Sequence, residues 1–170
     1  SLNLKLSISL ASNEDLKRVE ELTLRTSQMN TTGIVFTYEE LLKIINDKRY
    51  QLYVVELEDR YGSYGKVGLV LLDVSQEQTW IINLFILSCR VMNRGIGNVL
   101  LSYILNQAKK KEYKVHALFK PTTRNRIMMI TYQFMGFKIV DETGDVLCLE
   151  HNLQKIESLP DYIKIVSKVD

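Results

Sequence analysis

The 170-residue chain has few of the residues on which disulfide-bonded, metal-binding and membrane proteins depend. Its two cysteines, Cys89 and Cys148, are too few for a disulfide framework and are typical of a reducing compartment, which predicts a cytoplasmic protein. Its two histidines lie far apart without paired cysteines or HxxxH spacing, so we expect no metal site. No run approaches the ~20 apolar residues that span a bilayer, and no hydrophobic signal segment opens the chain, so we expect no membrane partner.

A strong charge of either sign is absent as well. The formal net charge is +2, which gives no basis for expecting a nucleic-acid partner. Hydrophobic residues make up 46% of the chain and charged residues 25%, as in ordinary globular proteins. Only two prolines occur and no low-complexity linker interrupts the chain, so we interpret residues 1–170 as a single domain.

What the chain contains is a series of apolar strands and amphipathic helices. The periodicity predicts a strand, two helices, three strands, a helix, a strand, a helix and two final strands. The first helix follows Ser12 or Asn13, and Thr37 caps the second. The predicted strands lie at residues 6–10, 50–57, 66–73, 80–87, 115–119, 137–140 and 146–150. A third helix follows Gly95, and a fourth spans residues 124–135. A long turn at residues 58–65 joins two of the strands. The crossover from 80–87 to 115–119 implies one parallel pair in a mostly antiparallel α/β sheet.

The most informative run joins the strand at residues 80–87 to the following helix. Two glycines, Gly95 and Gly97, open that helix after a short basic loop. Backbone amides left uncovered at a helix N-terminus bind a pyrophosphate, glycine lets the ligand approach, and Arg94 adds a positive charge. This pattern predicts a nucleotide-type cofactor. The alternative is a helix that needs glycine to pack closely against the sheet.

Two motifs together resemble the GNAT acyltransferase superfamily. Residues 92–97 are similar to its loop (Q/R)xxGx(G/A), with Met92 in place of the first polar residue, and Asn125 with residues 132–137 is similar to its N…YxxxGF ending. The resemblance runs from about Asn13 to His151. It implies a sheet with helices on both faces, whose parallel strands splay apart around acetyl-CoA or another acyl-CoA. It also implies an acyl transfer of the N-acetyltransferase type to a small-molecule or carrier-bound acceptor.

The same resemblance implies roles for individual residues. The strand end would bind the pantetheine amides like an added strand, and the loop amides would hold the diphosphate; the residues concerned are Leu87, Ser88, Cys89, Arg94, Gly95, Ile96, Gly97 and Asn98. Tyr132 would protonate the departing thiolate, or is a core aromatic residue whose hydroxyl has a polar partner. Asn125 would bind the pantetheine arm or cap its helix. In the loop between the first two helices, Arg25, Gln28 and Asn30 would position the acceptor.

No residue stands out as a general base. The strand at residues 80–87 has no Asp or Glu, and Asn83 stands where many relatives place an acidic residue. An asparagine cannot accept a proton at pH 7. The other titratable candidates have more ordinary explanations. Glu56, Glu58 and Asp73 are typical of solvated strand ends, His116 is typical of a structural histidine, and Cys89 is typical of an inert cysteine.

A narrower resemblance is carried by residues 22–30, 87–91 and 121–125. They resemble the C-terminal GNAT-like domain of FkbH-like proteins, which usually carry a HAD-type phosphatase domain in front and make glyceryl-loaded acyl carrier proteins for polyketide-type biosynthesis. The chain itself has no DxDx(T/V) phosphatase motif. The resemblance implies a fused HAD-type domain as a partner. It also implies an alternative function, a non-catalytic domain that docks the phosphopantetheine arm of an acyl carrier protein.

Overall fold

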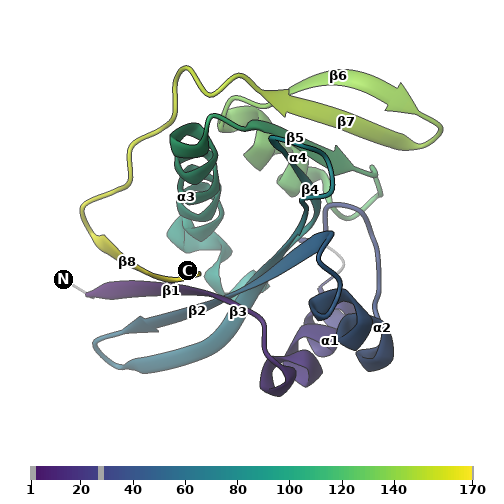
Figure 1. Cartoon of the computed structure of the whole chain (residues 1–170). Coiled ribbons are helices and arrows are strands. Elements are labelled where there is room, and N and C mark those ends of the chain that lie inside the picture. The colour runs from purple at the N-terminus through teal and green to yellow at the C-terminus, as the bar shows by residue number, and fades with distance from the viewer. Residues whose placement is uncertain (1–2, 27–28, 170) are drawn as a thin grey trace.

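The computed structural model describes residues 3–26 and 29–169, without the side chains of Met92 and Asn93. Within these residues one eight-stranded sheet has the order β6-β7-β5-β4-β3-β2-β1-β8 (Figure 1). The strands are β1 Leu4–Leu10, β2 Tyr50–Asp59, β3 Gly62–Asp73, β4 Thr79–Leu87, β5 Lys114–Phe119, β6 Lys138–Thr143, β7 Val146–His151 and β8 Ile163–Lys168. Neighbouring strands are antiparallel except β4–β5 and β1–β8. The predicted mixed, mostly antiparallel sheet is therefore confirmed.

Helices cover both faces of the sheet, as expected (Figure 1). On one face lie α1 Leu16–Arg25 and α2 Tyr38–Ile45, and on the other lie α3 Ile96–Lys111 and α4 Arg126–Phe134. Two short 3-10 helices, η1 Asn13–Asp15 and η2 Cys89–Arg94, precede α1 and α3. Each face has its own apolar core, because the strands direct alternate side chains to opposite sides.

The start of α2 shows how local sequence sets an element boundary. The Thr37 hydroxyl oxygen accepts the Glu40 backbone N–H at 3.1 Å, and the Glu40 carboxylate accepts the Thr37 N–H at 3.3 Å. This reciprocal pair satisfies two amides that a helix N-terminus leaves unbonded. The predicted cap at Thr37 is confirmed.

A bulge in β4 separates it from β5. Leu71 pairs with Leu84 and Leu72 with Ile82, so Asn83 is the extra residue. Such a residue bends its strand and increases the local twist. The β4–β5 pairing accordingly ends at Ile82, although β4 continues to Leu87. The expected splay of the parallel pair is present, and it leaves five residues of β4 without β5 beside them.

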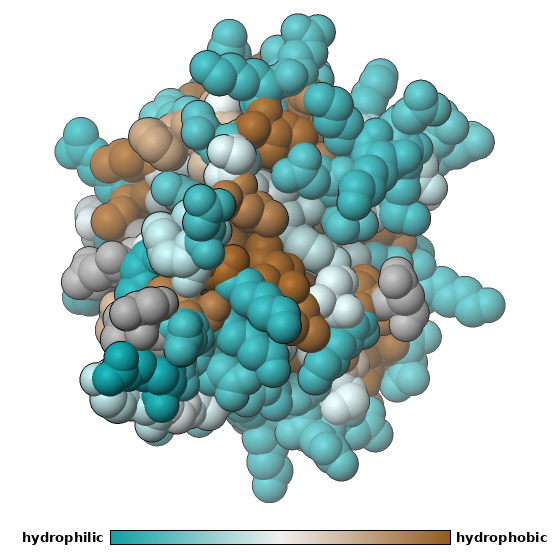
Figure 2. All heavy atoms as spheres, turned by 90° about the vertical axis from the view of Figure 1, so that its left-hand side faces the viewer, coloured by the Kyte–Doolittle hydropathy of each residue, from teal (hydrophilic) through white to brown (hydrophobic). Residues whose placement is uncertain are grey.

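Two elements differ from the sequence prediction. The turn expected at residues 58–65 is short, because β2 continues to Asp59 and β3 begins at Gly62. The unpredicted β8 pairs parallel to β1, which adds a second parallel pair. The tail before β8 passes over the side of the molecule shown in Figure 2, where apolar surface lies between hydrophilic side chains. No helix among the described residues is long and apolar enough to cross a membrane.

Candidate functional site

The free edge of β4 is covered by the chain itself. Residues 29–32, which we call the closing segment, run beside β4 in the antiparallel direction. The Thr31 N–H donates to the Phe85 carbonyl at 3.2 Å, and the Thr31 hydroxyl oxygen accepts the Phe85 N–H at 3.0 Å. The Leu87 N–H donates to the Met29 carbonyl at 3.4 Å. The closing segment thus makes the added-strand contacts that were predicted for a pantetheine arm at Leu87.

Asn125 fastens the closing segment from the β5 side. Its fully buried side chain donates through Nδ2 to the carbonyls of Asn30 at 2.9 Å and Lys120 at 2.8 Å, while its Oδ1 accepts the Thr122 N–H at 2.9 Å. The Lys120 N–H in turn donates to the Thr31 carbonyl at 2.9 Å. Asn125 stands at the start of α4, but its side chain makes no capping bond, so the capping interpretation is wrong for the side chain.

Tyr132 lies fully buried on α4, with its ring 5.0 Å from Phe137 and 6.1 Å from Phe85 between centroids. Its hydroxyl has no hydrogen-bond partner with acceptable geometry among the described residues. Burial raises the pKa of the phenol well above its ordinary value, and the nearby Thr31 hydroxyl lowers that pKa only slightly. The ring is therefore a core aromatic group, but the described residues do not supply the hydroxyl with the well-placed polar partner expected under that interpretation. A buried unpartnered hydroxyl requires an explanation, and a ligand atom supplies one.

The glycine of the YxxxGF motif, Gly136, is required by its backbone conformation and by its contact with His151. Gly136 has a φ of 100°, and a Cβ there would lie 2.9 Å from Nε2 of His151. The His151 Nδ1 accepts the Leu153 N–H at 2.9 Å, so its Nε2 carries the proton and donates to the Met135 carbonyl at 2.9 Å. Burial lowers the pKa of His151, which favours this neutral form.

The two glycines of the loop play different parts. Gly95 adopts a φ of 70° immediately before α3, where a residue with a Cβ would be strained. Gly97 is buried, and a Cβ there would lie 3.0 Å from the Leu87 side chain and 3.5 Å from that of Thr131. The close-packing alternative is therefore confirmed at Gly97. Both glycines still line a shallow pocket of about 270 Å³ between α3 and α4, together with Asn98, Ile127, Ile130, Thr131 and Phe134.

Arg94 is turned toward the β2–β3 hairpin. Its guanidinium donates to the Tyr64 hydroxyl oxygen at 2.7 Å and to the Asp59 carboxylate at 3.4 Å, and it lies 4.8 Å from the centre of the Tyr64 ring. The Tyr64 hydroxyl, the Tyr61 backbone N–H and Arg94 hold the pKa of Asp59 below its ordinary value, so this carboxylate is charged. The positive charge predicted beside a diphosphate is thus bound to the hairpin.

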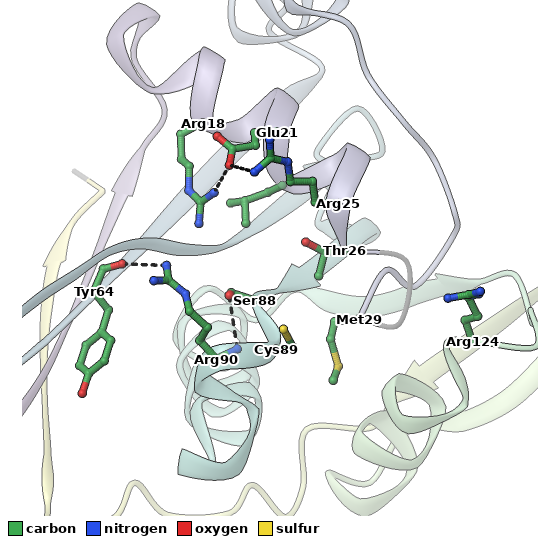
Figure 3. Close-up of a pocket in the computed structure, with 11 residues that line it drawn as sticks. Arg18, Glu21, Arg25, Thr26, Met29, Tyr64, Ser88, Cys89, Arg90 and Arg124 are labelled. Carbon is green, nitrogen blue, oxygen red and sulfur yellow. Dashed lines mark hydrogen bonds and ion pairs between the residues drawn. The ribbon is translucent and has the colours of Figure 1, made fainter.

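A larger pocket, of about 580 Å³, opens between α1 and the junction of β4 with η2 (Figure 3). We call it the arginine pocket; its lining residues include Arg18, Glu21, Arg25, Met29, Cys89, Arg90 and Arg124. Of the predicted acceptor residues, Arg25 lines it, whereas Asn30 is buried and its Oδ1 accepts the N–H groups of Thr32 and Gly33. Gln28 lies outside the described residues.

Sequence analysis missed Arg18, Arg90 and Arg124. Only Arg18 had a usable signal, because it lies seven positions before Arg25 and therefore on the same face of α1. The three carboxylates considered as general bases each have a partner. Glu58 forms an ion pair with Lys5 at 3.0 Å, Glu56 forms one with Lys66 at 3.6 Å, and Asp73 accepts a hydrogen bond from Ser75. Within the described part of the chain, no three His, Cys, Asp or Glu residues are grouped as metal ligands would be.

Comparisons with known proteins agree with the architecture. No protein-family model and no curated protein sequence matches the chain. Among solved structures, the Escherichia coli ribosomal-protein-S18-alanine N-acetyltransferase has a TM-score of 0.66 at 12% identity, with 89% of this chain and 96% of that one covered. The Thermoplasma acidophilum PaiA N-acetyltransferase in complex with coenzyme A has a TM-score of 0.66 at 19% identity over 86% and 98%.

A domain from Methanocaldococcus jannaschii is similar as well, with a TM-score of 0.70 at 17% identity over 86% of this chain and 97% of that one. At such identities the likeness is one of fold. The fold is that of GNAT N-acetyltransferases.

Proposed function

We propose that the chain is an acyl-CoA-dependent acyltransferase of the N-acetyltransferase type, with acetyl-CoA as donor and a small-molecule or carrier-bound acceptor. The observation that carries the proposal is the buried hydroxyl of Tyr132, which has no partner among the described residues. It belongs to the residue of the YxxxGF motif that would act as proton donor, and it packs against Phe85 of the splayed strand. The fold shared with N-acetyltransferases supports the same class of reaction.

The described residues fit an acyl-CoA at two of three places. The first turn of α3 has amides without helical partners, and it borders the 270 Å³ pocket. Tyr132 offers a hydroxyl that lacks a bond. The third place, the edge of β4, is taken by the closing segment. A pantetheine arm can bind that edge only after residues 29–32 have left it.

When bound, the coenzyme supplies an activated acyl thioester. A phenol is protonated at neutral pH, so Tyr132 can donate a hydrogen bond, and with it a proton, to a thiolate leaving group, although burial raises its pKa and makes it a weaker acid. The core around Phe85 and Phe137 keeps water from its ring. The closing segment, once displaced, exposes the N–H groups of Phe85 and Leu87 as donors for amide carbonyls.

Calorimetry with acetyl-CoA tests the proposal directly. Binding should be measurable, and the melting temperature should rise with ligand concentration by mass action. Tyr132→Phe should lower turnover by at least tenfold and leave the melting shift in place. Tyr103→Phe is the matched control, because its hydroxyl bonds to Ser167 of β8, and its turnover should be unchanged. No heat of binding at millimolar acetyl-CoA would end the proposal.

A second candidate is a domain that docks a carrier protein without catalysing transfer. It is favoured by the covered β4 edge and by three exposed apolar side chains along α4: Ile127, Ile130 and Phe134 are 42%, 54% and 66% exposed. Such a domain would work beside a fused HAD-type phosphatase domain in an FkbH-like protein. A phosphopantetheinylated carrier protein should then bind more tightly than the unmodified carrier, and equal binding of both forms contradicts it. For either candidate we expect a reducing compartment, the cytoplasm, because the chain has only two cysteines.

A further inference from the structure

Four arginines from three separate segments of the chain line the arginine pocket. Arg18 and Arg25 extend from α1, Arg90 from η2 and Arg124 from the loop before α4 (Figure 3). Glu21 is the carboxylate among the described lining residues. Four positive charges and one negative charge give the lining a formal charge of +3, whereas the whole chain carries only +2. The lining therefore has a local excess of positive charge.

Glu21 is shared between the two arginines of its own helix. Its Oε1 accepts from Nη1 of Arg18 and from Nη1 of Arg25, each at 3.0 Å. The Arg25 side chain is 77% exposed, and exposed pairs on a helix contribute little to stability. A ligand can therefore compete for the remaining N–H groups of Arg25 at small cost.

Arg90 and Arg124 have no ion-pair partner among the described residues. Arg90 donates one Nη2–H to the Tyr64 carbonyl at 3.2 Å, which leaves most of its fork of donors unused. The side chain of Arg124 makes no hydrogen bond within the described chain; only its backbone N–H is bonded, to the Thr122 hydroxyl oxygen at 3.1 Å. A guanidinium presents parallel N–H groups that match the oxygens of a carboxylate or a phosphate.

The pocket also borders the place where the acyl group would arrive. Met29 lines the pocket and is the first residue of the closing segment on β4. Leu22 adds apolar surface, and Ser88 and Cys89 stand directly after the end of β4. An acceptor whose anionic end is bound by arginines at the rim would extend past Met29 toward that edge.

From this geometry we infer that the arginine pocket binds an anionic group, a carboxylate or a phosphate, on the acceptor of the transfer; the inference rests on the proposed function. Arg90 binds the oxygens of this group together with Arg25 from the α1 side, whereas Arg124 lies apart from them and adds positive charge on the other side of the pocket (Figure 3). Purely cationic amines are poor acceptors because the excess of positive charge in the pocket repels them, and neutral amines gain no attraction from its arginines.

Matched acceptor pairs test the inference by activity. With acetyl-CoA as donor, release of the coenzyme thiol is followed for 4-aminobutyrate against butylamine and for O-phosphoethanolamine against ethanolamine. We expect kcat/KM to be at least tenfold higher for the anionic member of one pair, and the pair that shows it distinguishes carboxylate from phosphate. Equal rates within both pairs overturn the inference while leaving the proposed acyl transfer intact.

Binding without a donor tests the pocket independently of catalysis. Calorimetry with the preferred anionic probe should show affinity that falls as salt is added. Arg90→Gln and Arg25→Gln should each weaken it on the order of tenfold, since each removes charge-assisted hydrogen bonds. Lys43→Gln is the control, because Lys43 is exposed on α2 and its substitution removes one positive charge away from the pocket.

The two sets of results separate the possible failures. Anion binding that depends on Arg90 and Arg25, without thiol release from any acceptor, would retain the pocket as an anion site and reject the transferase. No binding of either anionic probe, or equal loss in Lys43→Gln, would reject the pocket.

Discussion

Replacing Thr31 by valine tests whether the closing segment competes with a ligand for β4. The substitution keeps the branched shape of the side chain and removes the hydroxyl oxygen that accepts the Phe85 N–H at 3.0 Å. We call the arrangement with residues 29–32 on β4 the closed form. Thr31 is fully buried, so in the closed form of the variant the Phe85 N–H would lose its partner without gaining water. A buried donor left without a partner costs about 1–3 kcal/mol.

This cost falls on the closed form alone, because the same N–H is hydrated once the segment has left β4. A loss of about 1.4 kcal/mol raises the open fraction tenfold. The apparent dissociation constant of a ligand that binds only the open form is its intrinsic value divided by that fraction. We therefore expect Thr31→Val to bind acetyl-CoA about tenfold more tightly than the wild type, although the variant protein is less stable.

Two measurements check this result. Calorimetry gives the affinity, and hydrogen exchange reports opening at the Leu87 and Lys120 amides, which donate to the closing segment and should exchange faster. The control is Thr23→Val, because Thr23 is also buried and its hydroxyl oxygen accepts the Phe36 N–H at 3.2 Å, away from β4. It should lower the free energy of unfolding without changing the affinity. Faster exchange in Thr31→Val with unchanged or weaker binding would refute the reasoning.

Three further predictions concern stability, measured by urea unfolding. Asn125→Ala removes three hydrogen bonds of a buried side chain and should lower the free energy of unfolding by about 3 kcal/mol, whereas a loss under about 1 kcal/mol would show that they contribute little. Gly136→Ala should cost about 2–4 kcal/mol through its φ of 100° and the contact with His151, against about 1 kcal/mol for Gly144→Ala, which meets open space. Because burial lowers the pKa of His151 from 6.5, its contribution to stability is complete above about pH 6.5 and is lost as the pH falls through the lower folded value. Unfolding at pH 8 and pH 5 should show this loss in the wild type, and an equal loss in His151→Gln would assign it to another group.

Local patterns were enough to predict most of the fold. The capping box at Thr37 and the apolar stripe of α1 depend only on residues within a few positions of each other. The strand β8 was missed because its pairing is with β1, at the other end of the chain, and its own alternation is short. The splay of β4 from β5 came from the family resemblance, whereas its physical cause, the bulge at Asn83, appears only in the pairing register.

The candidate site was less predictable because its contacts come from distant segments. The run from Arg25 to Thr32 has no helical or strand period, so it was interpreted as an acceptor loop. Its actual position depends on Asn125, which joins the carbonyls of Asn30 and Lys120. Arg90 and Arg124 likewise line one pocket only because η2 and the β5–α4 loop both border it.

The hydrogen bonds of the closing segment show which partners the edge of β4 requires. The bulge at Asn83 turns this edge away from β5, so the amides of Phe85 and Leu87 need other partners in a buried setting. A peptide satisfies them with alternating N–H and C=O groups, and an extended ligand with amide bonds presents the same groups. Residues 29–32 thus meet the same requirement for amide partners that such a ligand would meet. A polar variant in which residues 29–32 stay on β4 and exclude every acyl-CoA would instead identify them as a permanent ninth strand of the sheet. The hydrogen-exchange rate at the Leu87 N–H therefore distinguishes a segment that leaves β4 from one that does not.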